Sequence, residues 1–163
     1  MLLYLIRHAR AGDRDPVNYP DDSQRPLTEE GKKSFRKFLR WLSEARIAPT
    51  AVLSSPYTRC QQTTELFLEH LAEQKQTPAL HYYEELGSGA SPDDFYHVIA
   101  KHPTAERLAI VGHMPDLGFI AGELLGGAAL HFSKGAIAAI RCDSLQPGAG
   151  ELLWLAGPKL AGK

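Results

Sequence analysis

Four basic side chains in this sequence are of types that can together bind and transfer a phosphoryl group. They come from three separate segments of the chain: Arg7, His8, Arg59 and His113. The planar guanidinium group of arginine matches a phosphate with two parallel hydrogen bonds. A neutral imidazole nitrogen can accept a phosphoryl group without first losing a proton, which makes histidine a covalent nucleophile. Brought together, these side chains predict phosphoryl transfer, a reaction that needs mainly positioning and charge stabilisation.

Short apolar runs alternate with amphipathic segments along the chain, which is typical of an α/β fold. Helices are expected after Thr28, from Ser55-Pro56 to about His70, after Ser91, and over residues 115–125, because serine and threonine are good helix caps. Strands are expected at residues 1–6, 51–54, 79–83, 108–111, 136–140 and 151–155. This order predicts a three-layer α/β/α sandwich with a mostly parallel central sheet, whose last two strands form a hairpin-like edge.

The expected elements bring the four basic residues to one edge of this sheet. Ligands of open α/β sheets bind outside the carboxyl ends of the strands. Arg7 and His8 directly follow the first strand, Arg59 follows the second, and His113 follows the fourth. Arg59 also lies in the first turns of a helix, where free N–H groups favour an anion. We therefore expect a phosphate site there, with His8 as nucleophile and His113 as a protonated partner.

Length and composition agree with one domain over residues 1–163. Hydrophobic residues make up 44% of the chain and charged residues 23%, with a formal net charge of -1. No global basic field recruits nucleic acid, and no apolar run is long enough to span a membrane, so a cytoplasmic protein is expected. Two cysteines, Cys60 and Cys142, are too few for a disulfide framework or a cysteine zinc site, and we expect both to be reduced.

Five motifs resemble those of the histidine phosphatase superfamily, which has the phosphoglycerate mutase-like fold. In order they are LIRHARAG (5–12), RPLTEEG (25–31), VLSSPYTRCQQT (52–63), EELGSG (84–89) and AIVGHMPDLG (109–118). The chain is short, and its RPLT and SSPYTR segments resemble those of the small SixA-type branch of phosphohistidine phosphatases. One departure is Ala9, which stands where the family signature has glycine.

The resemblance implies roles for six residues. His8 would be the nucleophile that carries the phosphohistidine intermediate, and Glu85 matches the place of the general acid in larger members of the family. The phosphate pocket would be formed by Arg7, Arg25, Arg59 and His113. A phosphoramidate protonated on its ring leaves as neutral imidazole and needs an acid less than an ester does. An uncertain acid position therefore favours a phosphohistidine substrate.

The preferred function is dephosphorylation of phosphohistidine on a protein, such as a histidine phosphotransfer domain, because so short a chain has few residues for a lid over a small substrate. One alternative is a phosphatase for small phosphate esters. Another is a phosphate-binding or protein-binding module without turnover. A metal hydrolase is disfavoured, because no HxH pair, HExxH motif or aspartate cluster accompanies the histidines. No metal, cofactor, nucleic-acid partner or membrane partner is expected.

Overall fold

The computed structural model describes residues 1–162, which contain one six-stranded mixed sheet. The strands lie in the order β3-β2-β4-β1-β5-β6. The first four strands of the chain run parallel to one another, and β5 pairs antiparallel with both β1 and β6. Their bounds are β1 (Leu2–Arg7), β2 (Ala51–Ser54), β3 (Ala79–Tyr82), β4 (Arg107–Gly112), β5 (Ile137–Cys142) and β6 (Gly150–Ala156). The expected mostly parallel sheet with a hairpin-like edge is confirmed.

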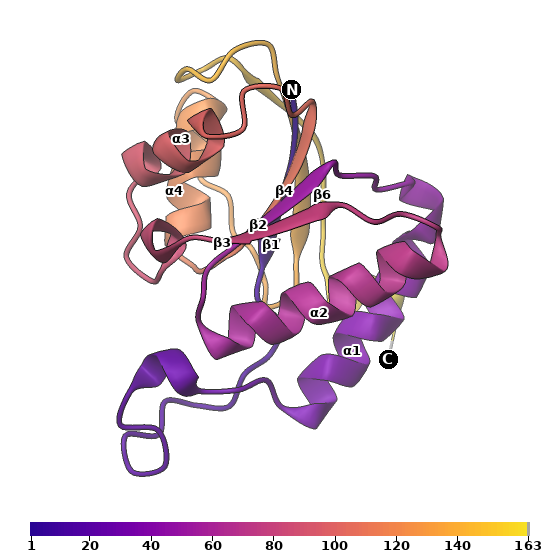
Figure 1. The fold of residues 1–163 in the computed structure, drawn as a ribbon, viewed down its shortest axis with the longest axis vertical. Coiled ribbons are helices and arrows are strands. Elements are labelled where there is room, and N and C mark those ends of the chain that lie inside the picture. Colours follow the sequence, from indigo (N-terminus) through magenta and orange to yellow (C-terminus); the bar gives the residue numbers. More distant parts are fainter. Residues whose placement is uncertain (163) are drawn as a thin grey trace.

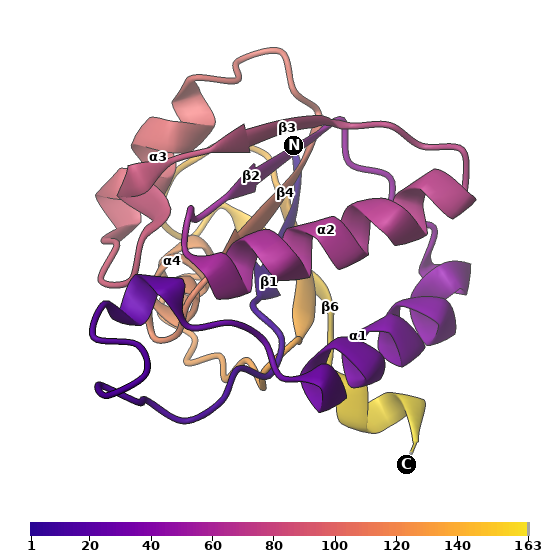
Figure 2. The same ribbon diagram turned by 60° about the horizontal axis from the view of Figure 1, so that its bottom comes forward.

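Helices cover both faces of this sheet, which confirms the three-layer α/β/α arrangement. The helices α1 (Glu29–Trp41) and α2 (Thr58–Glu73) pack together on one face. The helices α3 (Pro92–Ala100) and α4 (Asp116–Leu124) pack together on the other (Figure 1). Turning the molecule shows the sheet between these two pairs, with the loop after β1 projecting beside the start of α2 (Figure 2). Within the described residues, no helix is long and apolar enough to cross a membrane.

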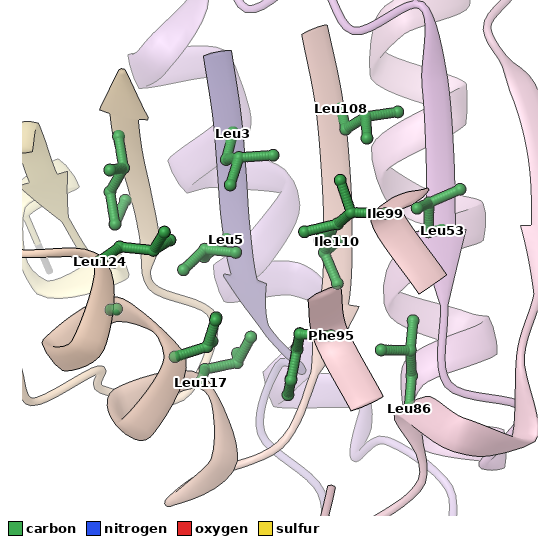
Figure 3. Close-up of a cluster of buried hydrophobic side chains, with 14 of the residues drawn as sticks. Leu3, Leu5, Leu53, Leu86, Phe95, Ile99, Leu108, Ile110, Leu117 and Leu124 are labelled. Atoms are coloured by element: carbon green, nitrogen blue, oxygen red, sulfur yellow. The ribbon is translucent and has the colours of Figure 1, made fainter. Parts of the chain in front are cut away.

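The central strand β1 is apolar on both faces because helices cover both faces. Its Leu3 and Leu5 belong to the core under α3 and α4, where Figure 3 shows them among other buried leucines. Its Tyr4 and Ile6 belong to the second core, under α1 and α2. Side chains alternate across a strand, so a continuous apolar run is what a doubly covered strand requires. The strand is therefore a rigid support for whatever follows Arg7.

The expected helix caps are confirmed for α1 and α3 and wrong for α2. Thr28 caps α1 by accepting the N–H of Gly31, and Ser91 forms a capping box with Asp94 at the start of α3. Ser55 does not cap α2, which begins at Thr58 and ends at Glu73, beyond the expected end at His70. The Ser55 hydroxyl accepts the N–H of Tyr57, the residue just before the helix, and lies 2.9 Å from Nε2 of His113.

Candidate active site

The pairing of β1 with β4 brings the two histidines together. The register places Arg7 opposite Gly112, so both strands end at the same level. The backbone N–H of His8 then donates to the carbonyl of Gly112 at 3.1 Å. The imidazole rings of His8 and His113 lie edge to face, with centroids 5.4 Å apart. The sequence-based prediction that these strand ends converge is confirmed by this geometry.

The His8 ring is oriented as a nucleophile requires. Its Nδ1 lies 2.8 Å from the carbonyl oxygen of Ala9. A carbonyl only accepts hydrogen bonds, so Nδ1 must carry the proton, and the lone pair belongs to Nε2. Burial, with a smaller contribution from Arg59 and Arg7, lowers the pKa of His8 to about 3. The ring is therefore neutral around pH 7, the form that can accept a phosphoryl group.

Two arginines present buried donors that have no acceptor among the described residues. The Nε atoms of Arg7 and Arg59 are buried and make no hydrogen bond in the described residues. Arg7 is held by its Nη1, which donates to the carbonyl of Phe132 at 2.6 Å. Arg59, which is 3% exposed, is the second residue of α2. Buried donors without partners are unfavourable unless a ligand supplies the acceptors, and a phosphate has the charge and geometry to do so.

His113 is fixed by contacts on both ring nitrogens. Its Nε2 lies 2.9 Å from the Ser55 hydroxyl, and its Nδ1 lies 3.4 Å from Nη2 of Arg59. Because Arg59 can only donate, Nδ1 accepts and Nε2 carries the proton. The ring of Tyr57 packs against the His113 ring with centroids 4.9 Å apart, and the Arg59 guanidinium lies over the same tyrosine.

The expectation that His113 is protonated is not met in this pocket. Burial, followed by the charge of Arg59, lowers the pKa of His113 to about 3. Two neighbouring guanidinium groups repel a third positive charge when no anion is bound. The protonated form would need the negative charge of a bound phosphate.

Arg25 joins this group through Asp22, a residue that the sequence did not single out. Its Nε donates to Oδ1 of Asp22 at 2.9 Å, and its Nη1 donates to the carbonyl of Gly12. The charge of Arg25 contributes to the lowered pKa values of His8 and His113, so it acts on both rings. The other carboxylate oxygen of Asp22 contacts Arg59 at 3.2 Å.

Glu85 is placed differently from the other predicted site residues. It lies in a short 3-10 helix, η3 (Glu84–Leu86), directly after β3. Its carboxylate accepts a 2.6 Å hydrogen bond from Lys101, which lowers the pKa of Glu85. An ionised carboxylate does not donate a proton, so this ion pair weighs against a general acid at Glu85.

Several contacting residues were missed by sequence reasoning because the sequence offers no signal for them. Asp22 lies in a polar loop, and Tyr57 and Ser55 resemble ordinary helix-start residues. Cys60 is fully buried with its sulfur 3.6 Å from His113 Nε2, and burial raises its thiol pKa to about 12. A thiol protonated to that extent is unreactive. No group of three or more His, Cys, Asp or Glu side chains in residues 1–162 is placed to hold a metal ion.

Known proteins are similar to this chain in both sequence and fold. Residues 3–85 match the family model of the histidine phosphatase superfamily (branch 1). An uncharacterised protein of Picosynechococcus is 30% identical over 167 residues, covering 98% of each chain. The phosphohistidine phosphatase SixA of Escherichia coli is 26% identical, covering 97% of this chain and 94% of the relative.

A solved structure supports the same assignment. The protein histidine phosphatase SixA complexed with tungstate superimposes with a TM-score of 0.83 at 25% identity, covering 98% of this chain and 99% of that one. The matched fold is the phosphoglycerate mutase-like fold that the five motifs led us to expect. The chain therefore belongs to the histidine phosphatase superfamily and to its small SixA-type branch.

Proposed function

We propose that this phosphatase removes the phosphoryl group from phosphohistidine on a protein through an intermediate on His8. The observation that carries the proposal is the hydrogen bond from His8 Nδ1 to the Ala9 carbonyl, which leaves Nε2 free. The unpartnered Nε atoms of Arg7 and Arg59 supply donors for the phosphoryl oxygens. Arg25 and His113 complete the proposed pocket.

In the first step the phosphoryl group moves from the substrate ring to His8. A bond forms between His8 Nε2 and phosphorus while the substrate N–P bond breaks. The substrate ring keeps the proton on its other nitrogen and leaves as neutral imidazole, so no acid is required. The proton on His8 Nδ1 stays in place, and its hydrogen bond to Ala9 stabilises the positive charge that develops on the phosphorylated ring.

In the second step water attacks phosphorus and the His8 N–P bond breaks. The bonding electron pair returns to Nε2, which restores the neutral ring. The two protons of the water leave with the product as dihydrogen phosphate. The arginines stabilise the equatorial oxygens in both steps. No proton transfer from Glu85 enters this sequence, which agrees with its ion pair to Lys101.

The choice of a protein substrate rests on two observations. His8 is 7% exposed and His113 is 2% exposed, so both rings lie below the surface of the protein. The leaving group must then lie at the surface, where a side chain presented by another protein can reach. The similarity to SixA, a phosphohistidine phosphatase, favours the same substrate class.

The experiment compares two substrates with the same enzyme. Purified protein is incubated with a phosphohistidine-bearing phosphotransfer domain and, separately, with p-nitrophenyl phosphate. We expect rapid loss of phosphate from the domain and slow ester hydrolysis. The phosphohistidine intermediate on His8 is destroyed by acid. The reaction is therefore quenched with alkali, and the intermediate is detected as an alkali-stable phosphoprotein. Efficient ester turnover with an untouched phosphodomain would instead identify a small-ester phosphatase.

Matched variants assign the chemistry to His8. His8→Ala should abolish both activities, whereas His97→Ala changes an exposed histidine on α3 and should retain them. A chelator should have no effect. Phosphate binding without turnover on any substrate would contradict the enzyme and support a binding module.

A further inference from the structure

Asp22 places a carboxylate against the arginines of a pocket that we assign to an anion. Its Oδ2 lies 3.2 Å from Nη2 of Arg59, and its Oδ1 accepts the Nε–H of Arg25 at 2.9 Å. Its backbone carbonyl accepts a further hydrogen bond from Nη1 of Arg59 at 2.8 Å. One residue in the loop after β1 therefore contacts two of the arginines assigned to phosphate binding.

This carboxylate is ionised in the folded protein. Its hydrogen bond with Arg25 is the main cause of the lowered pKa of Asp22, and the charges of Arg59 and Arg25 add to it. The Asp22 side chain is 33% exposed, whereas that of Arg59 is 4% exposed. The negative charge thus lies toward the mouth of the pocket, with the buried guanidinium beneath it.

A fixed negative charge in a phosphate pocket has a definite consequence. It repels a phosphate dianion and competes with it for the guanidinium charge of Arg59 and Arg25. Such a charge weakens binding of substrate phosphoryl group and product phosphate alike. For an enzyme that must release inorganic phosphate after every cycle, weaker product binding favours turnover.

We propose that Asp22 is a resident counter-anion that keeps the affinity of the pocket for phosphate low and thereby favours product release. The statement about product release rests on the proposed function. The effect of Asp22 on phosphate affinity does not, because it holds for any pocket built on Arg59 and Arg25. Asp22 is a positioning and affinity-setting residue, and it forms no bond to the reacting atoms.

A neutral isostere separates the charge of Asp22 from its structural contacts. In Asp22→Asn the backbone carbonyl still accepts from Arg59, and the amide oxygen can still accept from Arg25. The substitution removes the negative charge, and the amide nitrogen that replaces one carboxylate oxygen can no longer accept from Nη2 of Arg59. A purely structural role would therefore predict equal or weaker phosphate binding, whereas the proposed role predicts tighter binding.

The first test is a calorimetric titration of the whole protein with inorganic phosphate at pH 7. We expect Asp22→Asn to bind phosphate roughly three- to tenfold more tightly than the wild type, as expected for loss of one partly screened charge. Asp22→Glu, which keeps the charge, should stay near the wild-type affinity. Asp21→Asn is the matched control, since it removes the same charge from a residue that accepts from Ser23 and Gln24 and, within residues 1–162, forms no ion pair with an arginine.

The second test measures turnover of p-nitrophenyl phosphate with phosphate as inhibitor. We expect Asp22→Asn to lower both KM and the inhibition constant of phosphate, and to lower kcat because phosphate is released more slowly. If Asp22→Asn does not fold, Asp22→Ser removes the same charge and should give the same tightening. Weaker or unchanged phosphate binding in a folded neutral variant would overturn the proposal.

The two proposals fail in different ways. Tighter phosphate binding by Asp22→Asn in a protein that hydrolyses neither substrate would reject the proposed catalytic function and retain the role of Asp22. Hydrolysis of the phosphodomain together with unchanged phosphate affinity in Asp22→Asn would reject the role of Asp22 and retain the catalytic function.

Discussion

The two histidines of the pocket are neutral because they are buried beside permanent positive charges. Desolvation disfavours the charged imidazolium, and Arg59 adds repulsion at both rings. A neutral His8 has a free lone pair at physiological pH, which a nucleophile needs. The same arrangement makes the folded protein sensitive to acid, because an unfolded chain can protonate these rings freely.

The first prediction concerns the dependence of stability on pH. Both histidines have folded pKa values near 3, against an ordinary value of 6.5 for a histidine exposed in the unfolded chain, so below pH 6.5 the unfolded state binds more protons. The free energy of unfolding should fall as pH drops from 7 to 5, by about 1–2 kcal/mol for each histidine. Urea denaturation in phosphate-free buffer measures this.

A variant of one histidine provides the control for the pH prediction. His113→Gln should show a shallower fall over the same pH range than the wild type. His97→Gln, which changes an exposed histidine, should follow the wild-type curve. A wild-type stability that is flat between pH 7 and pH 5 would contradict the buried neutral pair.

The second prediction concerns the Ser55 hydroxyl that holds His113. Ser55→Ala leaves the buried Nε2–H of His113 without its acceptor. An unsatisfied buried donor costs about 1–3 kcal/mol, so we expect that loss in the free energy of unfolding together with a fall in kcat. Ser54→Ala is the control, because the equally buried Ser54 hydroxyl bonds to Ser55 O and Thr64 instead. It should lose stability while retaining kcat.

The first turn of α1 supports the loop that carries His8. The carbonyl of Arg10 accepts the backbone N–H of Thr28, and Gly31 lies against the same carbonyl so closely that an added Cβ would overlap it. The missing side chain at Gly31 therefore allows the nucleophile loop to pack on the helix. Ala9, next to His8, is also held by its N–H, which donates to Thr63 on α2 at 3.0 Å.

The third prediction follows from this packing of α1 on the loop. Replacing a glycine within a helix by alanine usually raises the free energy of unfolding by up to about 1 kcal/mol. Gly31→Ala should instead lower the free energy of unfolding by about 1–3 kcal/mol. The new Cβ would overlap the backbone carbonyl of Arg10, which cannot move aside as a flexible side chain would. It should also reduce kcat by moving the loop after β1. Ser34→Ala, at an exposed position of α1, is the control, and a stabilised Gly31→Ala would refute the packing argument.

On the scale of the whole molecule, two hollows of different charge each include a residue next to the proposed pocket. One, of about 290 Å³, includes Ala9, and its charged lining residues are Arg10, Glu30, Lys134 and Lys159. The other, of about 300 Å³, includes Tyr57 and has Glu84 and Asp94 on its rim. Complementary charges steer association more than they add affinity. A protein substrate is large enough to contact both hollows, whereas a small ester contacts only the pocket.

The fourth prediction uses this difference between substrates. Lys134→Glu or Lys159→Glu should change kcat/KM for the phosphodomain by about two- to fivefold, and the change should shrink at high salt. The same variants should leave hydrolysis of p-nitrophenyl phosphate unchanged. Lys75→Glu, an exposed lysine just beyond the far end of α2, is the control and should affect neither substrate. Equal effects on both substrates would contradict docking across the hollows.

The sequence predicted the fold because its local signals agree with the tertiary arrangement. Apolar runs are long enough for strands buried on both faces, and the caps at Thr28 and Ser91 are independent of distant residues. The convergence of His8, Arg59 and His113 also follows from sequence order, because parallel strands end at a common edge. Ser55 was misinterpreted, since a serine before proline resembles a helix cap until its distant partner is known.

The sequence by itself determined the α/β architecture and the presence of two arginines and two histidines at one edge of the sheet. Only the tertiary structure decided which histidine nitrogen is free, that both rings are neutral, and that Asp22 faces the arginines. The physical reason is that the succession of strands and helices along the chain depends on local patterns of hydrophobicity, whereas tautomers, pKa values and ion pairs depend on contacts between residues far apart in the chain.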